Sequence, residues 1–144
     1  MKQIVINRCH GGFGLSDQAV RRYLELAGLS VYPEATDSSI MGSTYWLIRE
    51  GPERYNDDVI SAMWPTMTIE ERQAANAKWD EQVFCPRDIA RNDPLLIQTI
   101  LELGEDAGNW ACVPAVVEIP DDVEWIIEEY DGLEWIAEKH RTWN

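Results

Sequence analysis

The sequence lacks the features that mark several common protein classes. Its three cysteines, Cys9, Cys85 and Cys112, form no C-x-x-C pair, which argues against a disulfide framework and against a structural zinc site. Only two histidines are present, His10 and His140, so a metal site would depend on carboxylates. No run of eighteen apolar residues occurs, and the polar start does not resemble a signal peptide. We therefore expect an unanchored, cytoplasmic protein with reduced thiols.

Positive charge is also scarce. The 144 residues include 12 Lys and Arg against 26 Asp and Glu, for a net charge of −14. Residues 1–30 hold four basic and two acidic side chains, and residues 31–104 hold six basic and thirteen acidic ones. Residues 105–144 hold two basic and eleven acidic side chains, so the negative charge is concentrated at this end of the sequence. Such a surface repels nucleic acid and attracts proteins with basic patches, whereas the simpler reading is that acidity promotes solubility.

The first thirty residues predict a strand, a turn and a helix. The β-branched run within 2–8 is typical of a strand buried on both faces, and the glycine-rich segment 11–14 follows it. Ser16 is a good N-cap residue, and Gly28 is placed to end the helix that begins there.

The middle of the chain gives weaker signals. Short strands are expected at 31–32 and 45–48. A capping box beginning at Thr68 predicts a helix over 69–83, and Asp93 followed by Pro94 predicts a second helix that runs towards Gly104 or Gly108.

The C-terminal part changes to the period of two that is typical of strands. We expect strands at 115–119, 123–130 and 133–141, joined as a meander, because Asp131-Gly132 is a strong hairpin signal. A two-residue turn there places Glu129 opposite Glu134. This like-charge pair costs stability unless a cation, a hydrogen bond or a basic partner relieves it.

Together these elements predict an α+β fold. The expected architecture is an antiparallel or mixed sheet, built from the N-terminal strand and the C-terminal β-meander and covered by two or three helices. We expect one domain over residues 1–144, with residues 31–85 as a variable insertion.

Two groups of motifs resemble a family of short, mostly uncharacterised proteins of bacteriophages and related mobile elements. The first is Lys2–Ser16, KQIVINRCHGGFGLS. The second comprises Arg87–Ile89, Asn92–Ile97, Leu103–Glu105, Val117–Trp125, Ile127–Gly132 and Glu138–Trp143. The resemblance implies a phage setting and assigns no catalytic residue.

The acidic C-terminal hairpin is the first candidate site, as a surface that binds a protein partner. Aromatic anchors can supply binding energy while the surrounding acids steer an arginine-rich partner. Alternatively, the tryptophans belong to the core and the glutamates to a solvated face. The candidate residues are Glu124, Glu128, Glu129, Asp131, Glu134, Glu138, Trp125 and Trp135.

The glycine-rich turn is the second candidate, as an anion site at a helix N-terminus. Its residues are Arg8, Gly11, Gly12, Gly14 and Ser16. The segment matches neither a P-loop nor a dinucleotide fingerprint, so tight-turn geometry explains it more simply.

These observations favour a binding protein over an enzyme, without cofactor or metal. The leading hypothesis is a phage-encoded inhibitor of a host defence protein, such as an anti-CRISPR that mimics nucleic acid with its carboxylates and blocks a basic nucleic-acid-binding surface. It would bind neither nucleic acid nor membranes directly. One alternative is a protein that binds or removes a small nucleotide signal through residues 11–16, and another is a virion component.

Overall fold

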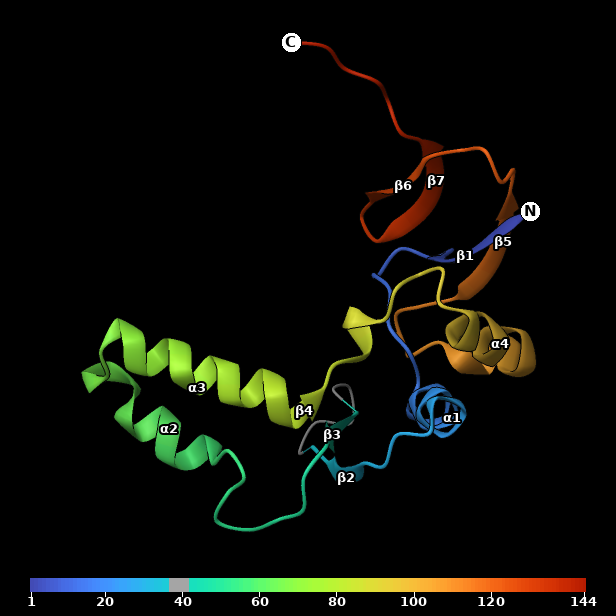
Figure 1. The fold of residues 1–144 in the computed structure, drawn as a ribbon. Coiled ribbons are helices and arrows are strands. Elements are labelled where there is room, and N and C mark those ends of the chain that lie inside the picture. Colours follow the sequence, from blue (N-terminus) through green and yellow to red (C-terminus); the bar gives the residue numbers. More distant parts are fainter. Residues whose placement is uncertain (37–41) are drawn as a thin grey trace. The chain divides into compact units, whose positions relative to one another are not determined.

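The protein forms two compact units in the computed structural model, which describes residues 1–36 and 42–144. The first unit combines Met1–Leu29 with Pro86–Asn144, and the second is Ser30–Cys85 (Figure 1). The second unit is nearly coextensive with the segment 31–85 that the sequence sets apart.

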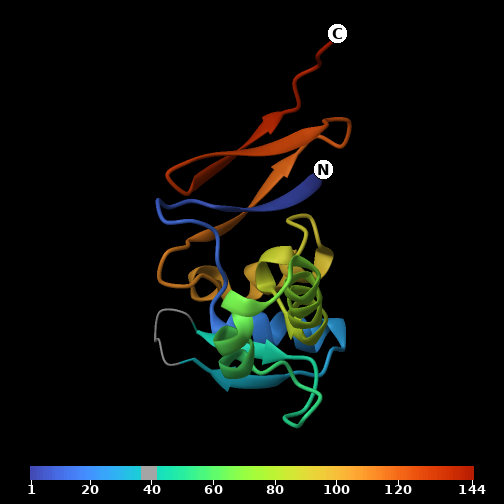
Figure 2. The same cartoon turned by 90° about the vertical axis from the view of Figure 1, so that its left-hand side faces the viewer.

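Antiparallel strand pairs form the framework of the first unit. Strand β1 (Lys2–Asn7) pairs with β5 (Pro114–Ile119), and β6 (Trp125–Tyr130) pairs with β7 (Leu133–Glu138) as a hairpin that contacts β1 (Figure 2). The expected α+β class with antiparallel strands is confirmed.

The continuous meander expected from β5 to β7 does not form, because β5 pairs with β1 and not with β6. Pro120 follows β5 and the chain turns, with Val123 N donating to Pro120 O at 3.3 Å. Lys2 Nζ donates to Val123 O at 2.9 Å, which fixes this turn beside the start of β1.

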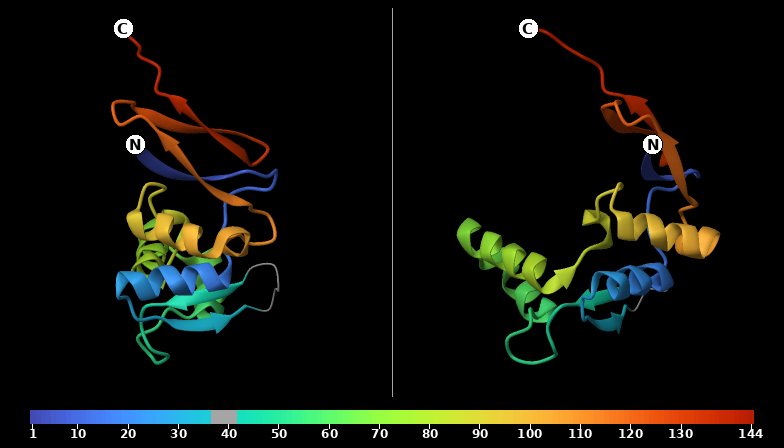
Figure 3. Two further views of the ribbon diagram at one scale, coloured as in Figure 1. Left: turned by 90° about the vertical axis from the view of Figure 1, so that its right-hand side faces the viewer. Right: turned by 45° about the vertical axis from the view of Figure 1, so that its right-hand side comes forward.

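Two helices of the first unit begin after the residues that are predicted to cap them. Helix α1 (Asp17–Ala27) begins after Ser16, whose Oγ accepts from Ala19 N, and ends at Gly28 with φ +71°. Helix α4 (Pro94–Leu103) begins after Asp93 and lies beside α1 (Figure 3). Short 3-10 turns precede and follow α4, at η2 (Pro86–Asp88) and η3 (Gly104–Ala107).

The core of the first unit lies on both sides of α4, which packs against β1 and β5 on one side and against α1 on the other. Ile4, Val5, Leu24 and Leu96 are at most 2% exposed, and β1 is buried on both faces as its composition predicts. Each such side chain contributes about 1.5–3 kcal/mol through burial.

The second unit is a small sheet with a helical hairpin. Tyr55 and Trp46 each make an edge-on contact with Trp79, with ring centroids 5.2 and 5.4 Å apart, and the Arg54 guanidinium lies 4.4 Å from the Trp46 ring centroid. Thr68 caps the longer helix as predicted. The elements are β2 (Tyr32–Ala35), β3 (Ser43–Trp46), α2 (Asp57–Met63), η1 (Trp64–Thr66), α3 (Ile69–Gln82) and β4 (Val83–Phe84).

Candidate partner-binding surface

The Asp131-Gly132 turn sets the register of the β6–β7 hairpin. Both residues have positive φ, +49° and +85°, as a type I′ turn requires. The ladder then pairs Tyr130 with Leu133 and Glu128 with Trp135, in agreement with the sequence-based register.

One face of this hairpin is exposed and carries large apolar side chains. Ile126, Tyr130 and Trp135 are 37%, 73% and 42% exposed, and the cross-strand pairing places all three on the same face. Trp135 Nε1 donates to Glu128 Oε2 at 2.9 Å, which fixes the indole on the surface. We call Ile126, Glu128, Tyr130 and Trp135 the outer face.

The hairpin carries exposed carboxylates on both faces: Glu128 belongs to the outer face, whereas the pairing of Glu138 with Trp125 and of Glu129 with Glu134 places Glu129 and Glu138 on the opposite face. Among residues 1–36 and 42–144, no ion pair involves the five exposed acids of the hairpin, and Glu129 accepts only a turn hydrogen bond, from Gly132 N at 3.0 Å. Exposed anions beside exposed aromatics are the combination that a basic protein surface can recognise. The five acids are Glu124, Glu128, Glu129, Asp131 and Glu138.

Glu134 differs from these acids because its charge is used inside the protein. Arg91 Nη1 and Nη2 donate to its two carboxylate oxygens at 2.7 and 2.9 Å, and Asn7 N donates to Oε1 at 2.8 Å. The Arg91 guanidinium also lies 3.5 Å from the Phe13 ring centroid. The repulsion expected between Glu129 and Glu134 is thus relieved by Arg91 and by Gly132 N, and Glu134 takes no part in the exposed surface.

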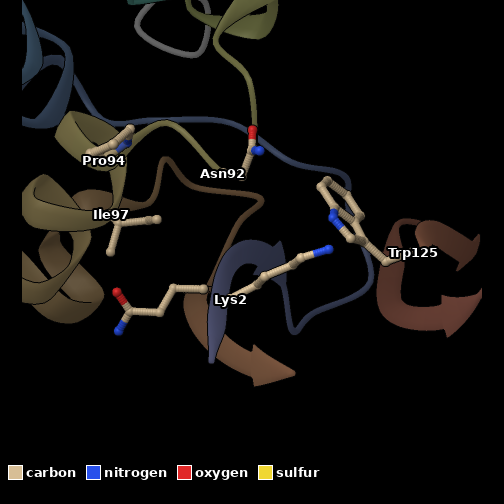
Figure 4. A pocket seen from close by; sticks show the side chains of 6 residues that line it. Lys2, Asn92, Pro94, Ile97 and Trp125 are labelled. Carbon is tan, nitrogen blue, oxygen red and sulfur yellow. The ribbon is translucent and has the colours of Figure 1, made fainter. Parts of the chain in front are cut away.

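Trp125 lies on the opposite face of the hairpin from Trp135. It is half-buried and lines a pocket of about 410 Å³ in the first unit (Figure 4). The other lining residues are Lys2, Gln3, Asn92, Pro94 and Ile97. A second pocket of about 340 Å³ lies by Glu124 and the C-terminal segment 139–143.

The glycine-rich turn is occupied by packing contacts. A Cβ on Gly132 would overlap Gly11 N and Gly12 N, so the hairpin turn lies directly against these two amides. Gly14 O accepts from Asn109 N at 3.3 Å. A Cβ on Gly11 or Gly14 would overlap Ala111 or Asn109, whereas a Cβ on Gly12 would meet open space and its φ of +100° is what favours glycine there.

Ser16 is likewise engaged within the fold. Its Oγ donates to Asp106 O at 2.7 Å and accepts from Ala19 N, while its N donates to Ala107 O at 2.9 Å. Arg8 is exposed, and its main-chain N donates to Val113 O. In the structure, Gly11 and Gly12 pack against the hairpin turn and Ser16 caps α1. The Arg8 side chain lies at the surface.

Cys9 and Cys112 lie within the fold of the first unit, whereas Cys85 is exposed. Cys9 Sγ donates to Ala111 O at 2.9 Å, and burial raises the pKa of Cys112. Within the described ranges, no group of three or more His, Cys, Asp or Glu side chains is arranged to hold a metal ion.

Comparison of the chain with protein-family models, curated proteins and solved structures gives no match. In the part of the chain that the structure describes, no helix combines the length and apolar character needed to cross a bilayer.

Proposed function

We propose that this protein is an inhibitor that binds a basic, nucleic-acid-binding surface of a host defence protein, such as a CRISPR effector, through the outer face of its β6–β7 hairpin. The observation that carries the proposal is the exposure of Tyr130 and Trp135 beside carboxylates that no internal cation pairs with. The resemblance of the sequence to short phage proteins supports a host defence protein as the target.

The mechanism would be competition for a basic channel. Carboxylates spaced along a hairpin present negative charge to arginines and lysines that otherwise bind phosphates, and the aromatic side chains add apolar contact area. Because Glu134 is paired with Arg91, the proposed surface leaves it out. It comprises the outer face with Glu128, together with Glu124 and Asp131, and is extended by the exposed Glu129 and Glu138 of the opposite face.

The glycine-rich turn supports a ligand-binding function less well. Gly132 lies directly against the amides of Gly11 and Gly12, and the Ser16 hydroxyl is used to cap α1, so packing and capping occupy the groups that would hold a phosphate.

The test is a panel of bacterial strains, each carrying one nucleic-acid-guided defence system and challenged with a phage that the system restricts. We expect the wild-type protein to restore plaque formation by several orders of magnitude in at least one strain. Charge reversal at Glu124 and Glu138, whose side chains make no hydrogen bond or ion pair with any residue that the structure describes, should abolish the rescue.

Asp80→Lys/Glu81→Lys is the matched control. Both residues are exposed at the end of α3, where lysine suits the helix dipole, and the double variant changes net charge by the same amount. It should act like wild type. The proposal fails if no strain responds, or if both double variants lose activity equally.

A further inference from the structure

The outer edge of β1 has main-chain groups directed away from β5. In an antiparallel ladder, residues that bond the partner strand alternate with residues whose N–H and C=O point outward. Arg8 N donates to Val113 O at 2.8 Å, in register with the ladder, whereas Val5 N donates outward to Arg91 O at 2.8 Å. Gln3, Val5 and Asn7 therefore form the outward-facing set.

Two of these three residues are satisfied by other parts of the first unit. Val5 O accepts from Arg91 Nη1 at 3.1 Å, and Asn7 N donates to Glu134 Oε1 at 2.8 Å. For Gln3, no hydrogen bond of the main-chain N–H or C=O occurs within residues 1–36 and 42–144. Arg91 and Glu134 thus cover the outer edge of β1 at Val5 and Asn7. The main-chain N–H and C=O of Gln3 are left for an external partner.

The open end of this edge coincides with the 410 Å³ pocket. Gln3 lines the pocket, and the Trp125 ring, Pro94 and Ile97 contribute apolar surface around it (Figure 4). The exposed Asn92 carboxamide has no hydrogen-bond partner in the described structure. Lys2 Nζ, the only cation of the lining, is bound to Val123 O.

We propose that this pocket binds an extended peptide segment of a partner protein, which pairs its main chain with Gln3 and places an apolar side chain against Trp125 and Pro94. A peptide residue carries the donor and acceptor that complement Gln3 N–H and C=O, as in strand addition to a sheet edge. This site uses the inner side of the hairpin and is separate from the outer face.

The charge around the pocket selects a cationic segment. In the turn between β5 and β6, Asp121 pairs with the N-terminal amine at 3.0 Å, and the exposed Asp122 and Glu124 make no ion pair within the described residues, so lysine or arginine next to the inserted apolar residue is favoured. The same carboxylates repel the phosphate of a nucleotide.

Proline substitutions separate main-chain pairing from side-chain contacts. Gln3→Pro removes the outward N–H without removing a bond to β5, and proline is tolerated at such edge positions. Val116, opposite Val5 on β5, also directs an unpaired N–H outward, on the far edge of the ladder. Val116→Pro is therefore the matched control, and Gln3→Ala keeps the N–H while removing the side chain.

The probe is a capped heptapeptide of alternating lysine and valine, titrated into ¹⁵N-labelled full-length protein. We expect shifts of the Gln3 amide and of the Trp125 indole N–H. Wild type, Gln3→Ala and Val116→Pro should bind alike, and Gln3→Pro should bind about tenfold more weakly, as expected for one lost hydrogen bond. The same peptide with N-methylated valines should lose affinity for wild type similarly.

The proposal is overturned if Gln3→Pro binds like wild type, if a glutamate-valine peptide binds equally well, or if the shifts are confined to Trp135 and the outer face. If Gln3→Pro does not fold, the N-methylated peptide decides the question on the wild-type protein. Gln3→Pro leaves every carboxylate in place, so it should weaken peptide binding and leave phage rescue unchanged, and either proposal can fail alone.

Discussion

Arg91 and Glu134 form a bidentate ion pair inside the first unit, with N···O distances of 2.7 and 2.9 Å. Their side chains are 20% and 11% exposed, so solvent screens the pair only weakly. Arg91 also bonds Val5 O, and Glu134 accepts from Asn7 N. The pair therefore links the segment before α4, strand β1 and the acidic hairpin.

Removing Arg91 leaves the Glu134 carboxylate, which is 11% exposed, without a cation to pair with. We expect Arg91→Ala to lower the free energy of unfolding of the first unit by about 3 kcal/mol, because an unpaired buried charge costs more than the pair gains. Urea denaturation followed through the amide resonances of β1 and β7 measures this loss.

Arg21→Ala is the matched control for that experiment. Arg21 pairs with Asp17 at 2.7 Å on the surface of α1, where both side chains are about half exposed. A surface pair four residues apart contributes about 0.3–0.5 kcal/mol. Equal losses for Arg91→Ala and Arg21→Ala would contradict the structural role of the inner pair.

The hairpin turn also fixes the glycine-rich segment, which makes Gly132 sensitive to substitution. Its φ of +85° favours glycine, and a Cβ would overlap Gly12 N and Gly11 N. We expect Gly132→Ala to cost about 3 kcal/mol or more in the free energy of unfolding, because strain and overlap combine.

The substitution Gly28→Ala measures the cost of backbone strain alone, without the steric overlap that a Cβ meets at Gly132. Gly28 has a similar φ of +71°, but a Cβ there meets no atom within 4 Å. We expect a cost of about 1–2 kcal/mol, the usual penalty for a left-handed residue. The packing argument for Gly132 is contradicted if the two substitutions have the same effect in urea denaturation.

The local elements of this fold follow from the sequence. Ser16, Thr68 and Asp93 cap helices as predicted, and Asp131-Gly132 sets the hairpin register. Each of these features depends on neighbouring residues, which is why sequence reasoning reaches them.

Long-range pairing is less accessible to sequence reasoning. The β1–β5 ladder joins Lys2 with Ile119, and no local signal distinguishes it from pairing between β5 and β6. The repulsion between Glu129 and Glu134 correctly signals that a relieving group is needed. Arg91 supplies it from a distant part of the chain, 43 residues away, so the residue itself is found only in the structure.

Glu102 gives a prediction for acidic pH. Its hydrogen bonds with Arg22, and then with Gln98, lower its carboxyl pKa from 4.5 to about 2. This interaction is fully present above pH 4.5 and is lost as pH falls towards 2. Carbon-detected titration should show a Glu102 midpoint near 2. We expect Arg22→Gln to return it most of the way to 4.5 and Gln98→Ala to raise it less, and the reverse order would contradict the assignment.

Tyr23 gives the corresponding prediction for alkaline pH. Burial, and then the hydrogen bond to Asp93 Oδ2 at 2.7 Å, raise the pKa of its phenol to about 12. Because the folded-state pKa lies above the ordinary value of 10, the contribution to stability is complete below pH 10 and is lost as pH rises through 12. Ultraviolet titration at 295 nm should therefore show one of the five tyrosines ionising near pH 12.

Two variants assign that late step. Tyr23→Phe should remove it, and the loss of a hydrogen bond to a charged acceptor should cost about 1.5–3 kcal/mol at pH 7. Asp93→Asn keeps a capping oxygen for Leu95 N, which Asp93 Oδ1 accepts at 2.8 Å, but removes the negative charge beside the phenol. The late step should then move to lower pH with α4 still formed. If it persists unchanged in Tyr23→Phe, another tyrosine carries it and the link between α1 and the start of α4 is not the cause.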